Sequence, residues 1–350
     1  MRTIQTDSSD LVHGGQLQKQ AKKYNIPAEN WLDLSTGISP YSYPVQTIPS
    51  SMWRRLPEFS DSLLKAVKQY YGSSKFVACA GSQAAIQAIP QVWKQVLKFS
   101  ATRPAKIWLP KVGYKEHQKH WISNGFSITH YVELPNASDL EENSVVVVIN
   151  PNNPSGAVYD SKILLELANT LAKKNGLLII DEAFIDSNLS LSIATKASHF
   201  KNLIILRSIG KFFGLAGIRL GFAFANDTWL KQLKVKLGEW PISGPSLYIA
   251  EKALSDSSWQ SAQRFRLDKQ SMALHSLLRR VFNLNSKGCN LFRTINLANA
   301  TEIFESLCKQ AVYVRLTDDK KSLRFGIPDS DGFFRLEKAL LNSMEFSQNK

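Results

Sequence analysis

The sequence predicts an α/β protein whose main sheet is largely parallel and doubly wound. Between about residues 60 and 225, short apolar stretches alternate with amphipathic ones such as 161–174. The apolar stretches are rich in β-branched residues and have no polar face, as expected of strands buried between two helical layers. This alternation favours parallel strands joined by helices. The predicted strands are 76–80, 106–109, 144–149, 176–180, 202–206 and 220–225.

The chain on either side of this region has a different character. A polar segment over about 245–282 is predicted to be helical, and shorter strand-like pieces lie near 289–296, 312–316 and 323–327, before a closing helix from about 331. The first forty residues are rich in Gly, Ser and Pro, which is typical of an arm. We therefore expect an N-terminal arm that joins the small domain (1–45), a large α/β domain (46–240) and a small C-terminal α+β domain (241–350).

Charge and composition limit the partners. The formal net charge is +14, but the basic residues form scattered pairs and lack the clusters of about five or more that mark a nucleic-acid-binding arm. We expect solvated faces, a few arginines that bind small anions, and no nucleic acid. The three cysteines, Cys79, Cys289 and Cys308, are far apart and predict reduced thiols in a cytoplasm. No apolar run approaches the roughly 20 residues that span a bilayer, and no signal peptide is evident, so no membrane partner is expected.

Polar residues follow the predicted strands at the point where each ends. Gly81-Ser82 follows the first strand, NPNNPSG (150–156) the third, Asp181 the fourth, and Ser208 with Lys211 the fifth. In an open parallel sheet the carboxyl ends of the strands line one crevice, and ligands bind there. We therefore expect these residues to lie together.

Several kinds of site are excluded. A P-loop would need glycine at 205 and Ser or Thr at 212, where the chain has Ile205 and Phe212. A GxSxG nucleophile elbow and an HExxH zinc helix are absent. His117 and His120 lack further ligands at metal-binding spacing and are interpreted as ordinary polar helix residues, so no metal site is predicted.

A lysine, an acid, an asparagine and an anion-binding turn suit pyridoxal 5′-phosphate. The lysine forms a Schiff base with the aldehyde. A carboxylate keeps the ring nitrogen protonated, which makes the ring an electron sink. Helix N-terminal amides and an arginine hold the phosphate.

NPNNPSG, IIDEAF and SIGKFFGLAGIRLGF (208–222) together resemble the pyridoxal-phosphate enzymes of fold type I that are related to class I and II aminotransferases. The resemblance covers about residues 10 to 330. It implies a Schiff base at Lys211, a pyridine-nitrogen contact from Asp181, and a donor to the ring's phenolate oxygen from Asn153. It also implies that the cofactor phosphate is bound by Gly81, Ser82, Ser208 and Arg219. Tyr114 is the aromatic residue implied to cover the ring.

HGGQL (13–17), LDLSTGISP (32–40) and LPKVGYKEH (109–117) resemble the threonine-phosphate decarboxylases of cobalamin biosynthesis. By this resemblance Arg324 binds the substrate α-carboxylate, while Arg315 and His13 receive the substrate phosphate. The planar guanidinium suits a carboxylate because it can donate two parallel hydrogen bonds. The implied reaction is decarboxylation of O-phospho-L-threonine, a small phosphorylated amino acid, to (R)-1-amino-2-propanol O-phosphate.

Two positions depart from the family's pattern. Phe184 stands where a tyrosine often donates to the phenolate oxygen, and Leu56 stands where a tyrosine commonly reaches the neighbouring subunit's cofactor. Leucine cannot donate a hydrogen bond, so the contact between subunits is in question. A homodimer is still what the resemblance implies.

Two alternatives stay open. An aminotransferase, such as one acting on histidinol phosphate, shares the fold and the cofactor residues. A nucleic-acid-binding regulator with an aminotransferase-like domain would need a separate helix-turn-helix domain, for which the first forty residues are too short and too rich in Gly and Pro.

Overall fold

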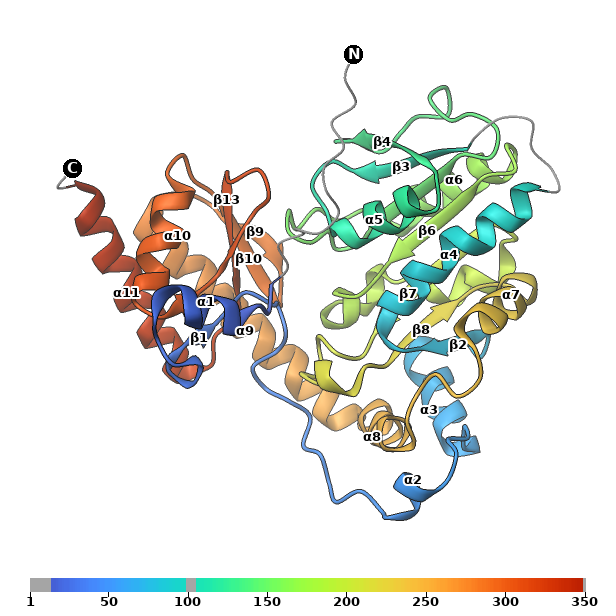
Figure 1. Cartoon of the computed structure of the whole chain (residues 1–350), viewed down its shortest axis with the longest axis horizontal. Coiled ribbons are helices and arrows are strands. Elements are labelled where there is room, and N and C mark those ends of the chain that lie inside the picture. Colours follow the sequence, from blue (N-terminus) through green and yellow to red (C-terminus); the bar gives the residue numbers. More distant parts are fainter. Residues whose placement is uncertain (1–13, 99–104, 349–350) are drawn as a thin grey trace. The chain divides into compact units, whose positions relative to one another are not determined.

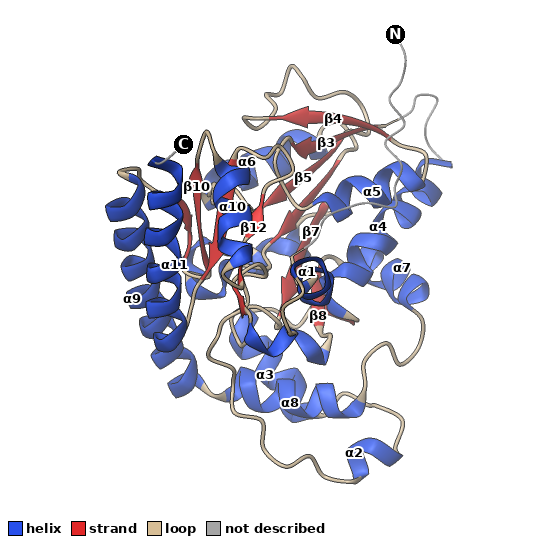
Figure 2. Ribbon diagram, turned by 60° about the vertical axis from the view of Figure 1, so that its left-hand side comes forward, coloured by secondary structure: helices blue, strands red, loops and turns tan. Residues whose placement is uncertain are grey.

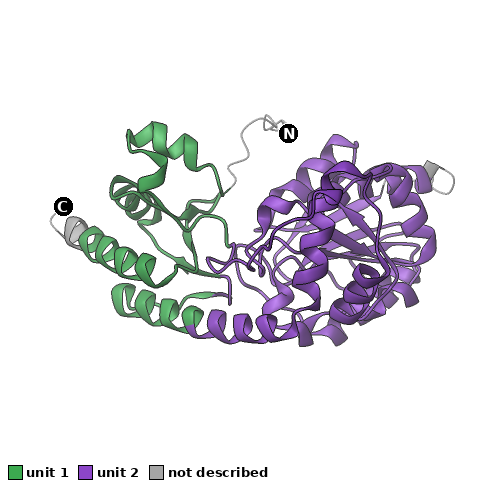
Figure 3. Ribbon diagram, turned by 90° about the horizontal axis from the view of Figure 1, so that it is seen from below, with its two compact units in different colours: residues 1–37, 270–287, 292–350 green, residues 38–269, 288–291 purple. Residues whose placement is uncertain are grey.

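The computed structural model describes residues 14–98 and 105–348, which form two compact units (Figure 3). Unit 1 takes the described residues up to Gly37, residues 270–287 and the described residues from Phe292 onward. Unit 2 takes Ile38–Lys269 and Gly288–Leu291. Among the described helices, none has the length and apolar character needed to cross a bilayer.

Unit 2 is built on a seven-stranded sheet with the strand order β2-β8-β7-β6-β5-β3-β4. Neighbouring strands are parallel except that β8 runs antiparallel to both β7 and β2. The six predicted strands are confirmed, and β4 is added. Their bounds are β2 (Phe76–Cys79), β3 (Lys106–Pro110), β4 (Ser127–Tyr131), β5 (Val145–Ile149), β6 (Leu177–Asp181), β7 (Leu203–Ser208) and β8 (Gly221–Phe224).

Every residue of β5, β6 and β8 is buried. The apolar stretches of the sequence therefore form the buried part of this sheet. Helix α4 (Gly81–Lys98) packs on β7 and β8 and is flanked by α5 (Lys115–Ser123) and α7 (Asp227–Leu237) (Figures 1 and 2). Helix α6 (Ser161–Ala172) packs on β6. The predicted α/β class with a mainly parallel sheet is therefore confirmed.

A second group of helices in unit 2 lies beside the sheet. Helix α8 (Gly244–Ser255) packs on α3 (Asp61–Tyr71) and on the short α2 (Ser51–Arg54). Helix α9 (Ser257–Phe282) follows it and contributes its first half to unit 2 and its second half to unit 1. Packing thus divides the chain after residues 37 and 269, whereas the sequence places domain borders after 45 and 240. The second border differs because α8 packs on α3. The first differs because the N–H groups of Ser39 and Tyr43 donate to the carbonyls of Lys211 and Phe213 in unit 2.

Unit 1 contains the other half of α9 and an antiparallel sheet in which β13 (Ser322–Gly326) lies between β12 (Arg315–Leu316) and β10 (Phe292–Asn296). The N-terminal segment enters this unit as β1 (Leu32–Asp33), which pairs in parallel with β11 (Val312–Tyr313). The remaining elements are α1 (Leu17–Tyr24), α10 (Ala300–Lys309) and α11 (Ser330–Gln348), and the chain passes between the units at β9 (Lys287–Cys289).

Candidate active site

Strand register brings the predicted residues of unit 2 to one edge of the sheet. Asp181, the last residue of β6, pairs with Ile149 at the end of β5 and with Leu206 near the end of β7. Ser208 closes β7 and pairs with Gly221, which in turn pairs with Cys79 at the end of β2. The segments that follow β2, β5, β6 and β7 therefore begin side by side at one edge of the sheet, as the sequence predicts.

The guanidinium of Arg219 lies close to the backbone where α4 begins. Gly81 has φ +70° and carries no side chain, and a Cβ there would lie 2.7 Å from Nη2 of Arg219. A Cβ at Gly221 would collide with the backbone nitrogen of Ser82. The guanidinium of Arg219 is thus packed against the first turn of α4, where unpaired N–H groups and the helix dipole favour negative charge.

Asp181 is buried and held by two contacts. Its Oδ1 accepts a hydrogen bond from the backbone N–H of Ala183 at 3.1 Å, and its Oδ2 lies 3.1 Å from Nε2 of His117. The Asp181 and His117 side chains are only 5% and 3% exposed. The interpretation of His117 as an ordinary polar helix residue is therefore wrong, because α5 turns this histidine inward onto the carboxylate.

Tyr114 directly precedes α5 as its N-cap residue. The Tyr114 hydroxyl donates to Oε1 of Gln83 at 3.0 Å, and Nε2 of Gln83 donates to Oε2 of Glu116 at 2.6 Å. The Tyr114 ring meets the His117 ring edge-on, with 6.4 Å between centroids. Nε2 of His120 lies 3.1 Å from Oε2 of Glu116. Burial lowers the pKa of His120, although the Glu116 carboxylate acts in the opposite direction. Tyr114 is thus fixed between the start of α4 and the histidine that contacts Asp181.

Lys211 and Asn153 lie in the turns that follow β7 and β5. The Nζ of Lys211 lies 5.7 Å from the ring centroid of the buried Phe184, and its carbonyl accepts the N–H of Ser39 at 3.0 Å. Asn153 is buried in the NPNNPSG turn. That turn is tied to the segment before Tyr114 because Asn152 Nδ2 donates to the carbonyl of Val112 at 2.8 Å.

The predicted substrate residues lie in unit 1, apart from His13, which is outside the described residues. Arg315 on β12 and Arg324 on β13 are direct partners across two antiparallel strands. Arg315 is 8% exposed and Arg324 is 1% exposed. Arg324 donates to the carbonyl of Ser35, and its guanidinium lies 5.5 Å from the Phe292 ring centroid. Among the described residues, Arg315 has an acid within 4 Å in Asp318, whose Oδ1 is 3.7 Å from Nη2 of Arg315.

The family model for aminotransferases of class I and II matches residues 50–336, which is most of the chain. This chain belongs to that family. Its relatives include a threonine-phosphate decarboxylase of Pseudomonas aeruginosa, 38% identical over 96% of this chain and 98% of that protein.

One further relative supports the family, and one solved structure supports the fold. A threonine-phosphate decarboxylase of a Sinorhizobium species is 34% identical over 95% of this chain and 98% of its own length. A histidinol-phosphate aminotransferase from Sinorhizobium meliloti, solved in complex with pyridoxal 5′-phosphate, has the same fold, with a TM-score of 0.78 over 98% of both chains at 16% identity. These findings confirm the predicted family and fold type.

The residues of this family member fit pyridoxal 5′-phosphate. At the corner of Gly81 and Arg219, the missing side chain of Gly81 lets the guanidinium lie close to the start of α4, where the positive charge and the helix N–H groups suit a phosphate. The buried carboxylate of Asp181 suits a protonated ring nitrogen, and Lys211 supplies the amine. Sequence reasoning missed His117, Gln83 and Glu116. The available signal was their position in the chain: Glu116 and His117 closely follow Tyr114 on α5, and Gln83 directly follows Ser82 at the start of α4.

Proposed function

We propose that this chain is a pyridoxal-5′-phosphate-dependent lyase that decarboxylates O-phospho-L-threonine to (R)-1-amino-2-propanol O-phosphate in cobalamin biosynthesis. Two nearly full-length relatives carry the name threonine-phosphate decarboxylase. The structural observation that supports the proposal is the pair of buried arginines, Arg315 and Arg324. The substrate has two anionic ends, a carboxylate and a phosphate, and two arginines at facing strand positions match them in charge.

Pyridoxal phosphate, when bound, supplies an aldehyde that condenses with amines and a ring that withdraws electrons from the bond that breaks. Lys211 would attach it, and Asp181, supported by His117, would keep a proton on the ring nitrogen. Gly81, Ser82, Ser208 and Arg219 would hold its phosphate, Asn153 its phenolate oxygen, and Tyr114 would cover the ring.

The substrate is oriented by the arginines of unit 1. We assign the α-carboxylate to Arg324 and the phosphate to Arg315, with His13 as a further contact. Two anchored ends leave the substrate little freedom to rotate, which favours breaking one chosen bond. After carbon dioxide leaves, the α-carbon of the substrate must gain a proton in place of the carboxyl group. We assign the delivery of this proton to Nζ of Lys211.

Product analysis tests this function. The enzyme is incubated with O-phospho-L-threonine and no keto acid, and carbon dioxide and aminopropanol phosphate are measured over many turnovers. Continuous release of both supports the lyase. A burst of one equivalent per active site that resumes only when 2-oxoglutarate is added would instead identify an aminotransferase.

We further propose that the protein is a cytoplasmic homodimer. In unit 2 an apolar patch is formed by Leu56, Phe59, Leu64 and Trp240, of which Leu56 is 64% exposed. Phe59 lines two cavities of about 410 and 240 Å³ under this patch. Arg55 and Glu58 line the smaller cavity, so a two-fold copy can meet it with opposite charges. A patch of this kind normally marks an interface.

Sedimentation tests the dimer. Trp240→Glu should convert it to monomer at micromolar concentration. Val132→Glu places the same charge on an exposed valine outside the patch and should leave the dimer intact. A wild-type protein that sediments as a monomer would refute the proposal. The cytoplasmic location rests on the cysteines, none of which is in a disulfide in the described chain, and cell fractionation tests it.

A further inference from the structure

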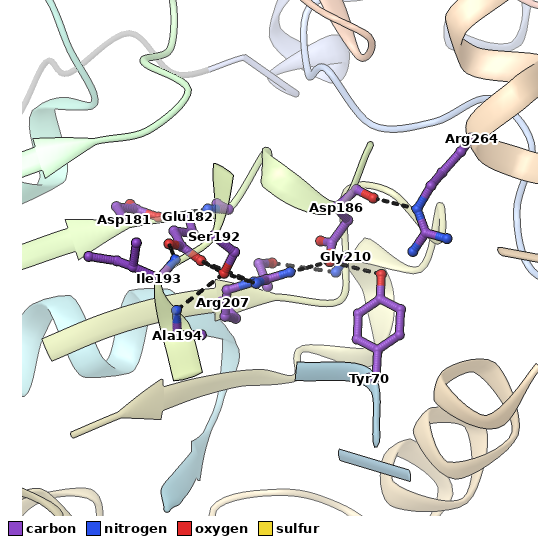
Figure 4. A network of polar contacts seen from close by, with 12 residues as sticks. Tyr70, Asp181, Glu182, Asp186, Ser192, Ile193, Ala194, Arg207, Gly210 and Arg264 are labelled. Atoms are coloured by element: carbon purple, nitrogen blue, oxygen red, sulfur yellow. Dashed lines mark hydrogen bonds and ion pairs between the residues drawn. The ribbon is translucent and has the colours of Figure 1, made fainter. Parts of the chain in front are cut away.

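A buried cluster of charged residues lies next to the candidate site, and none of its members has a part in the proposed chemistry. Arg207 is 1% exposed and lies between two carboxylates, Glu182 and Asp186, which are fully buried (Figure 4). Its Nη1 is 3.1 Å from Oε2 of Glu182, and its Nη2 is 2.5 Å from Oδ1 of Asp186. Glu182 and Arg207 are directly adjacent in sequence to the site residues Asp181 and Ser208.

Strand geometry explains the placement. Successive side chains of a strand point to opposite faces of the sheet. Glu182 directly follows Asp181, and Arg207 directly precedes Ser208. Arg207 and Ser208, the last two residues of β7, therefore point to opposite faces of the sheet, and Glu182 is the first residue after β6.

The connection between β6 and β7 lacks an α-helix. It consists of the 3₁₀ turns Ile185–Ser187, Leu189–Leu191 and Ala194–His199. Such turns supply few internal hydrogen bonds, so side chains must hold the segment in place. Glu182 accepts hydrogen bonds from the Ser192 hydroxyl at 2.6 Å and from the N–H of Ile193 at 2.9 Å.

Further residues tie the cluster to two helices. The Tyr70 hydroxyl on α3 donates to Oδ1 of Asp186 at 2.9 Å, and Nε of Arg264 on α9 donates to the carbonyl of Asp186 at 3.0 Å. The Arg207 guanidinium lies over the Tyr71 ring, 4.6 Å from its centroid. The cluster therefore connects the β6–β7 segment with β7, α3 and α9 within unit 2.

Stability alone is a poor reason for this cluster. Burying charges costs free energy that their attraction only partly returns, and apolar residues of similar volume are often as stable. Within the described chain, Oδ2 of Asp186, Nε of Arg207 and the Tyr71 hydroxyl have no hydrogen-bond partner. A buried group left unsatisfied is a further cost, which points to a role other than stability.

Two residues connect the cluster to the candidate active site: Ala183 and Phe184, which lie in sequence between Glu182 and Asp186. The N–H of Ala183 donates to Oδ1 of Asp181 at 3.1 Å, and the ring of Phe184 lies 5.7 Å from Nζ of Lys211. Both residues belong to segment 182–186, whose ends, Glu182 and Asp186, are bound to Arg207. Movement of either end would turn the Asp181 carboxylate or shift the ring beside Lys211.

We propose that Arg207 is a positioning residue of the active site. By holding Glu182 and Asp186 together it fixes the backbone of segment 182–186, and through Ala183 and Phe184 it sets the orientation of Asp181 and Lys211. The inference rests on the proposed function only for its effect on turnover. Its effect on Asp181 exists in the apoenzyme and can be measured there.

Three variants and a control test the role of Arg207. The triple variant Arg207→Met, Glu182→Gln, Asp186→Asn removes every charge of the cluster, so no carboxylate is left buried without a partner. Ser192→Ala is milder and deletes one hydroxyl that donates to Glu182 and accepts from Arg207 Nη1 at 3.0 Å. Arg207→Lys keeps the charge but cannot bridge two carboxylates with a planar fork. The control, Asn202→Ala, deletes a buried side chain next to the other end of β7 that donates to the carbonyl of Ala168.

The first measurement uses apoenzyme with ¹⁵N-labelled histidine, in which the His117 ring signals are assigned by their loss in His117→Gln. His117 reports on Asp181 because Nε2 lies 3.1 Å from Oδ2. We expect these signals to shift in the triple variant and in Arg207→Lys, and to a smaller extent in Ser192→Ala. They should be unchanged in Asn202→Ala, although that variant unfolds at a lower temperature.

The second measurement uses holoenzyme. With O-phospho-L-threonine we expect kcat to fall about tenfold to a hundredfold in the triple variant while KM changes little, because a small displacement of catalytic groups costs this much. Wild-type His117 signals and wild-type kcat in a folded triple variant would overturn the proposal. If the triple variant does not fold, wild-type values in both Ser192→Ala and Arg207→Lys overturn it instead. Shifted His117 signals in an enzyme without activity on this substrate would support the role of Arg207 and refute the proposed function.

Discussion

Arg315 and Arg324 lie directly opposite each other on neighbouring antiparallel strands, and both are buried. Like charges at such a position repel, which destabilises a sheet. In the described part of the chain, the acid paired with Arg315 is the exposed Asp318, whose Oδ1 lies 3.7 Å from Nη2 of Arg315. An arrangement that costs stability is understandable if the two guanidinium groups bind an anionic ligand.

The two arginines should differ in their effects on substrates. Arg324→Ala should weaken every amino-acid substrate, because all carry the α-carboxylate. Arg315→Ala should reduce kcat/KM for O-phospho-L-threonine about tenfold or more and affect threonine little, because hydrogen bonds to charged groups contribute about 1.5–3 kcal/mol. Steady-state kinetics with both substrates measures this. Equal losses for Arg315→Ala on the two substrates would remove the basis for a phosphate site there.

Lys211 should carry the cofactor covalently. Wild-type enzyme should absorb in the visible range, and borohydride should remove this band and leave the cofactor attached to the peptide that contains Lys211. Lys211→Ala should keep cofactor only by noncovalent contacts at the corner of Gly81 and Arg219. Mass spectrometry after reduction locates the link, and a modified peptide at another lysine would contradict the assignment.

The sequence could predict much of this site because its chemistry follows strand ends. Lys211, Asp181 and Asn153 each lie within a few residues of an apolar run, and parallel strands bring such positions together. The direction of β8 could not be predicted, because a short buried strand looks the same in either orientation. Strand β4 was missed because its residues, Ser127–Tyr131, are mostly polar or partly exposed.

The supporting residues were beyond sequence reasoning for a different reason. His117, Gln83 and Glu116 act through contacts between α4, α5 and the end of β6, which depend on how the helices are rotated. Arg207 looked like one more basic residue of a highly charged chain, and only its burial between Glu182 and Asp186 distinguishes it. Packing of this kind is a tertiary property that periodicity does not encode.

The cysteines should differ in reactivity. Burial raises the pKa of both Cys79 and Cys308 to about 12, so at pH 8 only about one molecule in ten thousand carries either thiolate. The thiolate is the reactive form. Cys289 is partly exposed. Iodoacetamide should therefore label Cys289 alone in native enzyme and all three cysteines after unfolding, as peptide mass spectrometry can show. Labelling of Cys79 in the native state would mean that the start of α4 opens.

The contact between His117 and Asp181 should appear as an energetic coupling. Asp181→Asn keeps the shape of the side chain and removes the charge that would pair with the protonated ring nitrogen of the cofactor. Losing one partner of a buried charged pair costs about 3–5 kcal/mol, which corresponds to a loss of at least about a hundredfold in kcat. His117→Gln removes only the group that holds Oδ2 at 3.1 Å, while the N–H of Ala183 still holds Oδ1. We therefore expect a smaller loss of kcat, about tenfold, from His117→Gln.

If His117 acts only through Asp181, the double variant should be no slower than Asp181→Asn alone, because the histidine no longer has a charge to orient. His120→Gln is the matched control: it lies on the same helix but contacts Glu116 at 3.1 Å, and it should change kcat little. The four rate constants form a double-mutant cycle measured by single-turnover release of carbon dioxide. Losses that multiply in the double variant would show that His117 has a separate role, such as a direct contact with the cofactor ring or the substrate.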